Sequence, residues 1–186
     1  MVNPVQCGPS APRAIFIAEL RRVLDAAVCG TADDARLPDL TAKLAEIAAA
    51  LEAGPACEPR YSTADWARFA PVAPALNLRI EDGAVRAAVR LGTAQGGPST
   101  VAHGGTVAAI LDHVMAAQMA TAGQPGVTTD LQVTYRRPTP LHTDLTVCAG
   151  HRLIDDRKVR VWAELEADGE LTAEATATFV TALRHD

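Results

Sequence analysis

One stretch of the sequence joins a polar, glycine-bearing start to a long apolar pattern that holds a single carboxylate. His103, Gly104 and Gly105 open the stretch, and Asp112 is the one acidic residue in the apolar run that follows. The first amides of a helix have no partner inside the helix, so they can donate to a carbonyl oxygen that gains negative charge. Asp112 could act as the base or nucleophile that hydrolysis of an acyl group also requires. The stretch therefore predicts chemistry at a polarised carbonyl carbon.

The residues after Gly105 predict one long helix that is buried on nearly all sides. The pattern continues to Ala122, and Gly123 is a natural C-terminal stop. A helix that is apolar nearly all round is expected to lie in a core rather than on a surface. The apolar residues at helical spacing are Val107, Ile110, Leu111, Val114 and Met115.

The spacing of Gly104 and Asp112 constrains how they could work together. They are eight residues apart, which is about 12 Å along a helix axis at about 1.5 Å per residue. Reacting groups must converge within about 3 Å of one atom. One copy of the helix cannot place both groups on one carbonyl carbon, whereas two antiparallel copies can. A catalytic site is therefore expected to be shared across a two-fold homodimer, alone or within a dimer of dimers.

Each of these residues also has a structural interpretation. A histidine followed by two glycines is a short motif, and glycines before a helix often serve only the turn. Asp112 could face solvent at a helix kink. His113 is expected to be a polar packing residue rather than a catalyst, because it points elsewhere on the helix. This stretch alone leaves the catalytic and the structural interpretations open.

Composition narrows the class of protein. The 186 residues fit one domain plus an extension, and the net charge of −5, without a basic run, argues against a nucleic-acid binder. No apolar run approaches the roughly 20 residues of a membrane span, and the N-terminus lacks the apolar core of a signal peptide. The histidines show no metal-ligand spacing, so a cytoplasmic protein without a metal is expected. The cysteines show no CxxC spacing and are expected to pack in a reduced protein: Cys7, Cys29, Cys57 and Cys148.

The chain before the long helix predicts a helical extension. Residues 1–12 are expected to be disordered, and residues 13–73 to form a helical hairpin and a linker that Trp66 and Phe69 anchor to the core. The hairpin helices are expected at 15–28 and 38–53, as a packing or oligomer-stabilising appendage. The apolar stripe of the first helix consists of Ile15, Phe16, Leu20, Val23, Leu24 and Ala27.

From residue 76 the apolar period changes to two, which predicts strands. Two strands precede the long helix and four follow it, with hairpin turns expected at Asp82-Gly83 and Asp168-Gly169. Consecutive hairpins require an antiparallel sheet, and its apolar face must cover the long helix, so residues 74–186 predict a two-layer α+β domain. In the strand after the helix, one face is predicted to carry Val127, Thr129, Leu131, Val133 and Tyr135, and the other Thr128, Asp130, Gln132 and Thr134.

This order of elements resembles the hotdog fold, an antiparallel sheet wrapped around a long central helix. His103-Gly104-Gly105, with Asp112 nine residues after the histidine, is similar to acyl-CoA thioesterases of the PaaI and THEM type, which are related to 4-hydroxybenzoyl-CoA thioesterases. The segments 126–128 and 133–138 match the strand that follows the helix in that family. The likeness covers roughly residues 74–183.

The resemblance implies a role for each of these residues. Asp112 is the general base or nucleophile, and the Gly104 amide polarises the thioester carbonyl. Thr128 assists the water or the carboxylate, and His103 orients the start of the helix. No cofactor is implied, because coenzyme A is part of the acyl-CoA substrate.

The sequence departs from the family at one polar position. Several members carry an amide side chain about six residues before the histidine, where this chain has Gly97 with Gln95 nearby. Gln95 is expected to replace it through the loop geometry, or the site lacks one polar group. The basic side chains near the strand ends are expected either to bind the phosphates of coenzyme A or to be ordinary surface charges. The candidate substrate-binding residues are Gly105, Gln95, Arg136, Arg137 and Lys158.

Three functions remain compatible with the sequence. The resemblance favours hydrolysis of acyl-CoA thioesters to the free acid and coenzyme A. One alternative is a hotdog enoyl-CoA hydratase, although such enzymes place their catalytic histidine differently on the helix. The other is a non-catalytic acyl-CoA-binding hotdog protein, which the glycine at 97 would suit. A binder gains nothing by burying a carboxylate such as Asp112, so release of free thiol from acyl-CoA is the expected activity.

Overall fold

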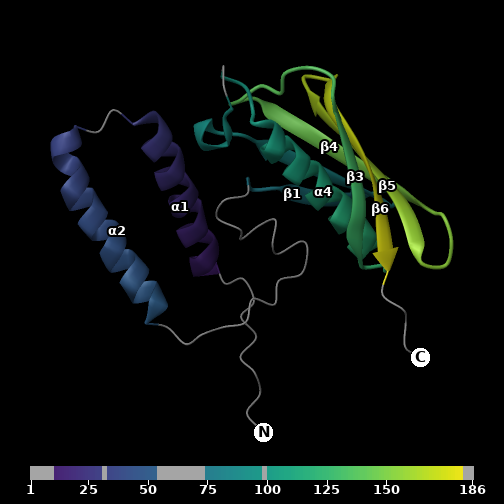
Figure 1. Ribbon diagram of the computed structural model, residues 1–186, viewed down its shortest axis with the longest axis horizontal. Coiled ribbons are helices and arrows are strands. Elements are labelled where there is room, and N and C mark those ends of the chain that lie inside the picture. Colours follow the sequence, from purple (N-terminus) through teal and green to yellow (C-terminus); the bar gives the residue numbers. More distant parts are fainter. Residues whose placement is uncertain (1–10, 31–32, 54–73, 98–99, 182–186) are drawn as a thin grey trace, which may run out of the picture.

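The computed structural model describes residues 11–30, 33–53, 74–97 and 100–181 (Figure 1). The predicted order of two helices, two strands, a long helix and four strands is confirmed. The predicted linker anchors Trp66 and Phe69 lie outside the described residues. The elements are α1 (Ala11–Cys29), η1 (Asp34–Arg36), α2 (Leu37–Glu52), β1 (Asn77–Glu81), β2 (Ala84–Arg90), η2 (Thr93–Gln95), α4 (Gly104–Thr121), β3 (Gly126–Tyr135), β4 (Asp144–Leu153), β5 (Lys158–Ala167) and β6 (Glu170–Thr181).

The six strands form one antiparallel sheet in the order β1-β2-β4-β5-β6-β3. The predicted hairpin turns are confirmed: Asp82-Gly83 and Asp168-Gly169 have positive φ at both residues, as a two-residue turn between twisted strands requires. The sheet curves around α4, which packs against β2, β4, β5, β6 and β3 (Figure 1). The α+β architecture expected of a hotdog fold is therefore confirmed.

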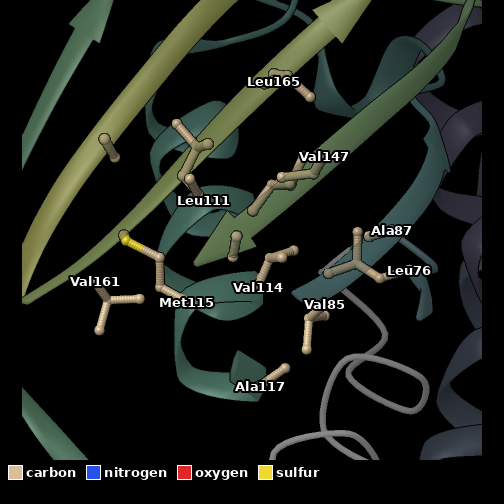
Figure 2. Packing of buried hydrophobic residues seen from close by; sticks show 14 of the residues in the cluster. Leu76, Val85, Ala87, Leu111, Val114, Met115, Ala117, Val147, Val161 and Leu165 are labelled. Atoms are coloured by element: carbon tan, nitrogen blue, oxygen red, sulfur yellow. The ribbon is translucent and has the colours of Figure 1, made fainter. Parts of the chain in front are cut away.

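The core lies between α4 and the concave face of the sheet. Leu111, Val114 and Met115 of α4 are fully buried, and Figure 2 shows Val114 below Val147 and Met115 pointing toward Val161 of the central strands. A buried leucine or valine contributes about 1.5–3 kcal/mol relative to an exposed one. α4 ends one residue before Ala122, followed by Gly123 at φ 69°, as predicted. The position of α4, and of the residues at its start, is thus fixed by packing on nearly all its sides.

β3 differs from its predicted register. Thr128 pairs with Phe179 and Asp130 pairs with Thr178, so Thr129 is an extra residue in a β-bulge. A bulge shifts the alternation of side chains by one. Thr128 therefore shares the concave face with its cross-strand neighbour Phe179, which is 1% exposed. The prediction that Thr128 and Leu131 face opposite sides of the sheet was wrong, because strict alternation does not allow for the inserted residue.

α1 buries a different side from the predicted apolar stripe. It begins at Ala11, with Pro12 in the first turn, where proline is tolerated; these two residues were expected to be disordered, and residues 1–10 lie outside the description. Ile15, within the stripe, is 67% exposed, whereas Ile17 is 7% exposed. α1 packs against η2, and the side turned toward η2 carries Asp25. The surface that the domain offers, not the apolar pattern, sets the rotation of α1.

α2 follows α1 along the chain through η1 and has no buried residue (Figure 1). Leu44, Ile47 and Leu51 are each about half exposed or more. These leucine and isoleucine side chains, with the exposed stripe of α1, leave an apolar surface on the N-terminal helices.

Candidate active site

His103 caps the start of α4 and leaves one backbone amide available. Its Nδ1 accepts a hydrogen bond of 3.0 Å from the Gly105 amide, and its carbonyl accepts from Thr106 and Val107. A side chain on Gly105 would place Cβ 3.0 Å from His103 Nδ1, so the cap requires a residue without one. The amide of Gly104 has no acceptor within the part of the chain that the structure describes. Gly104 is therefore the donor that this helix start can offer, while the Gly105 amide is occupied.

The loop before α4 is tied to His103 through η2. The backbone carbonyl of Gln95 accepts from the His103 amide at 2.9 Å, and the Gln95 side-chain oxygen accepts from the Gly92 amide at 2.9 Å. The Gly97 amide donates to Val101 at 2.8 Å, closing the loop in front of the helix. The polar group of Gln95 thus stabilises the η2 turn, and its expected contact with substrate stays a prediction.

Tyr135 completes the surroundings of Gly104 and was not singled out from the sequence. Its hydroxyl donates to the Gly104 carbonyl at 2.8 Å. A Cβ added to Gly104 would lie 3.3 Å from the Tyr135 hydroxyl oxygen. Tyr135 is 52% exposed. Its position at the end of β3, on the concave face opposite Ala173, brings it to the helix start. The signal that could have found it is its place in the family-like segment 133–138.

Asp112 and Thr128 form a second group further along α4. The Thr128 hydroxyl donates to Asp112 Oδ1 at 3.0 Å, and Asp112 is partly buried. The bulge in β3 is what turns Thr128 toward this carboxylate. The sequence prediction that these two residues act together is consistent with this contact. Because α4 is continuous from Gly104 to Thr121, Asp112 lies about 12 Å along the axis from Gly104.

The candidate phosphate-binding residues lie at two ends of the sheet. Arg136 and Arg137 form ion pairs with Glu174 and Glu170, and both backbone amides donate to the Thr172 carbonyl. Lys158, in contrast, pairs with Val180 near the other end of β6. Thr172 and Val180 are eight residues apart on β6, which is about 26 Å at about 3.3 Å per residue. The structure does not bring Lys158 together with the arginines within one chain. The residues at the opposite ends are Arg136, Arg137, Glu170 and Glu174 at one, and Lys158 at the other.

The remaining candidate side chains have structural surroundings. His113 is 9% exposed, in agreement with a polar packing residue. Cys148 is a partly buried free thiol, and no cluster that could hold a metal ion occurs in the described residues. Of the helices described, none combines the length and apolar character that a membrane span requires.

The arrangement provides a donor at one level of α4 and a carboxylate at another. The Gly104 amide can stabilise an oxyanion, and the Asp112 carboxylate, held by Thr128, can accept a proton or attack a carbonyl carbon. These are the two requirements of hydrolysis at an acyl carbon.

Comparison with known proteins connects this arrangement to one family. Residues 100–151, which contain the start of α4 and Asp112, match the family model described as the thioesterase superfamily. A solved structure of a thioesterase superfamily protein is 30% identical, with a TM-score of 0.83 over 92% of this chain and 96% of that chain. That coverage cannot be reached without most of α1 and α2, so the two proteins share the N-terminal helices. A search of curated proteins finds no match.

Other similar structures cover the sheet domain. A phenylacetic acid degradation-related protein of Ralstonia eutropha JMP134, assigned as a thioesterase, is 28% identical with a TM-score of 0.52, over 57% of this chain and 84% of that chain. A hypothetical thioesterase of Streptococcus pneumoniae, solved with coenzyme A, is 18% identical with a TM-score of 0.55, over 57% and 88%. The last of these similarities bears on the fold alone.

Proposed function

Because this chain belongs to the thioesterase superfamily and is a thioester hydrolase, we propose that it hydrolyses acyl-CoA to a free acid and coenzyme A. One observation carries the proposal. α4 presents an available backbone amide at Gly104 and, further along, the Asp112 carboxylate, which accepts a hydrogen bond from Thr128. The resemblance to PaaI-type thioesterases is confirmed by the family match and by the similar structures. Coenzyme A bound to the streptococcal relative supports the choice of thiol.

The chemistry follows from these two groups. The Gly104 amide donates to the thioester oxygen as negative charge develops there. Asp112 takes a proton from a water molecule whose oxygen bonds to the carbonyl carbon. Alternatively, Asp112 attacks that carbon itself, and a water molecule then hydrolyses the resulting acyl anhydride on Asp112 to give the free acid and restore the carboxylate. In both routes the carbon–sulfur bond breaks after the attack, and the thiolate of coenzyme A leaves and takes up a proton. Thr128 fixes one carboxylate oxygen of Asp112 through its hydroxyl, which leaves the other oxygen to act as the base or nucleophile.

The two groups are proposed to meet across a homodimer. β3 is at the edge of the sheet and exposes a ten-residue strand with Leu131 38% and Val127 68% exposed. A long exposed edge with apolar side chains is a natural site for pairing with a second chain. Antiparallel pairing of two β3 strands would bring the end of β3 that carries Tyr135, which contacts Gly104, toward the end of the other β3 that carries the partner's Thr128. In such a dimer the partner's Asp112 would lie near Gly104, as the spacing of about 12 Å within one chain requires if both groups act on one carbonyl carbon.

The expected phosphate contacts separate into two alternatives. Arg136 and Arg137 lie at the Gly104 level and already pair with glutamates, so coenzyme A phosphates would have to compete with Glu174 and Glu170. We propose that these arginines bind the phosphates, because within one chain they lie at the level of the oxyanion donor, whereas Lys158 could come to that level only from the partner chain. Removing either arginine should raise KM for acyl-CoA and weaken its salt dependence, while a short pantetheine thioester is little affected. Equal loss on both substrates would identify the arginines as structural.

Release of free thiol from a panel of acyl-CoA substrates tests the proposed function. Wild-type protein should release thiol, and Asp112→Asn should lower kcat by about 10²-fold or more while leaving folding intact. Asn keeps the shape of the side chain and can still accept from Thr128. Binding of acyl-CoA without thiol release would instead indicate a binding protein, and consumption of an enoyl thioester without thiol release would indicate a hydratase.

A further inference from the structure

A carboxylate from the N-terminal helices reaches the loop in front of the candidate active site. Asp25 of α1 accepts a hydrogen bond of 2.8 Å from the Ala94 amide in η2. The two residues are 69 positions apart in the sequence, so this is a tertiary contact between the extension and the sheet domain. Asp25 is partly buried by it.

Gly92 shows how closely this contact is fitted. A Cβ added at Gly92 would lie 2.5 Å from Asp25 Oδ1 and 3.0 Å from its Cγ. The backbone at Gly92 has φ −93° and ψ −174°, which any residue can adopt. The absence of a side chain is therefore not explained by backbone conformation. It is explained by the approach of Asp25, whose carboxylate occupies the space that a Cβ would take.

The contact continues to the start of α4 through three hydrogen bonds. Ala94 lies in the middle of η2, and the next residue, Gln95, closes the turn on Gly92 with its side chain. The Gln95 carbonyl accepts from the His103 amide. His103 in turn caps α4 and holds the Gly105 amide. Asp25 is thus connected to the residue before the Gly104 amide through the backbone of η2.

We infer that Asp25 is a positioning residue for thioester hydrolysis, which holds η2 against His103 and so fixes the direction of the Gly104 amide. This role rests on the proposed function of that amide as the oxyanion donor. It gives α1 a part in the site rather than that of a packing appendage. Small displacements of a donor from the reacting atom are costly, because about 1 Å of misplacement can lower a rate by about 10²-fold.

Three variants of the full chain test the role. Asp25→Ala should lower kcat about tenfold with KM within about twofold, because the lost positioning acts mainly in the transition state. Asp25→Asn keeps an acceptor oxygen and should recover most of the rate. Gly92→Ala should reproduce the loss without changing Asp25, because its Cβ displaces the carboxylate. The matched control is Glu19→Ala, which removes an exposed carboxylate of the same helix that pairs only with Arg22 among the described residues and should leave kcat unchanged.

A double variant separates this coupling from two independent defects. With Asp25→Ala in place, the space beside Gly92 is empty, so adding Gly92→Ala should cost little more. If the double variant lost kcat by the product of the two single-variant factors, the inference would be overturned. A kcat of Asp25→Ala equal to that of wild type would also overturn it.

Hydrogen exchange gives a readout that does not need activity. Asp25→Ala should increase exchange at residues 92–97 and at 103–107, while the core of α4 stays protected. An increase confined to 92–97 would show that α1 stabilises only the loop and would overturn the positioning role. If the wild type released no thiol, or if Asp112→Asn retained full activity, the proposed catalytic function would fail. The exchange result would still decide whether Asp25 is coupled to the helix start.

Discussion

α4 and α1 have nearly equal lengths, 18 and 19 residues, but they are held by different means. α4 is buried on most sides, with Leu111 and Val114 fully covered by the sheet. α1 buries Ile17, and its Asp25 carboxylate contacts the domain at η2. The position of α4 depends on a large buried apolar area, whereas the position of α1 depends on a few contacts at one loop.

The comparison shows that a helix can contribute little to the stability of the fold and still contribute to the candidate active site. α4 is buried at the centre of the core, and close packing around the helix also restricts the motion of its first residues. α1 has few buried side chains, yet its Asp25 carboxylate contacts the loop that holds His103. A helix with a small role in stability can therefore have a measurable role at the site.

The largest expected effect comes from the catalytic groups of α4 acting between two chains. Chains with Asp112→Asn and chains with Gly104→Pro should each be inactive, because one lacks the carboxylate and the other lacks the amide hydrogen. Proline suits this position, since Gly104 is the first residue of the helix and His103 before it is extended. Mixing the two with subunit exchange should restore about a quarter of wild-type activity, from half of the dimers having one intact site of two.

Gly104→Ala is the matched control for the proline variant. It adds the same close contact to Tyr135 but keeps the amide hydrogen, so it should retain much more activity than Gly104→Pro. If exchange of subunits is confirmed and the mixed chains stay inactive, the site lies within one chain. The argument from the 12 Å spacing would then be wrong.

The next effect concerns stability and compares the core helix with the extension. Leu111→Ala should lower the free energy of unfolding by about 2–5 kcal/mol, because it leaves a cavity in a fully buried site. Leu44→Ala on α2, which is 49% exposed, should change it by no more than about 0.5 kcal/mol. Denaturant titration of both variants provides the measurement. A large loss for Leu44→Ala would show that this surface is covered in solution by another copy or segment.

Much of the fold could be predicted because it rests on local signals. The two Asp-Gly turns, the period of two in the strands and the unbroken apolar run of α4 each identify their own element. The faces of α1 and β3 could not be predicted in the same way. The rotation of α1 depends on where η2 lies, and the alternation of β3 depends on a bulge at Thr129 that pairing with β6 defines.

The site shows the same limit. Gly104 and Asp112 lie on one helix that His103 caps, so their spacing in the sequence was enough to predict how far apart they are. Tyr135 and Asp25 reach the site only through tertiary contacts, with Gly104 and with Ala94. Nothing in the local sequence around Asp25 distinguishes it from Glu19, the exposed acid of α1.

A smaller effect on stability should come from the side of α1 that faces the domain. Ile17→Ala removes a side chain that is 7% exposed, whereas Ile15→Ala removes one that is 67% exposed. Ile17→Ala should increase hydrogen exchange throughout α1 while the sheet remains protected, because α1 can open without unfolding the core. Ile15→Ala should leave the exchange of α1 unchanged. If Ile15→Ala increased the exchange of α1 and Ile17→Ala did not, α1 would pack against the domain through the predicted apolar stripe.

The smallest effect is expected away from both helices, in the turn between β4 and β5. Backbone hydrogen bonds from Arg157 and Lys158, of 2.9 and 2.7 Å, hold the pKa of Asp155 below its ordinary value, and the positive charges of the same two residues act in the same direction. A carboxyl whose folded pKa is lowered stabilises the folded turn above the unfolded pKa of about 4 and loses that contribution as the pH falls through the folded pKa.

The chemical shift of the Lys158 amide measures this titration directly. Its midpoint should lie below about 4, and Asp155→Asn should abolish the change, while amide signals of α1 and α4 that contact no titrating group stay constant. A midpoint at or above the ordinary value would show that the turn does not hold the charged form. Movement of α1 signals together with Lys158 would show that the N-terminal helix is coupled to this end of the sheet as well as to η2, and the separation between a loop-bound α1 and a core-bound α4 would have to be redrawn.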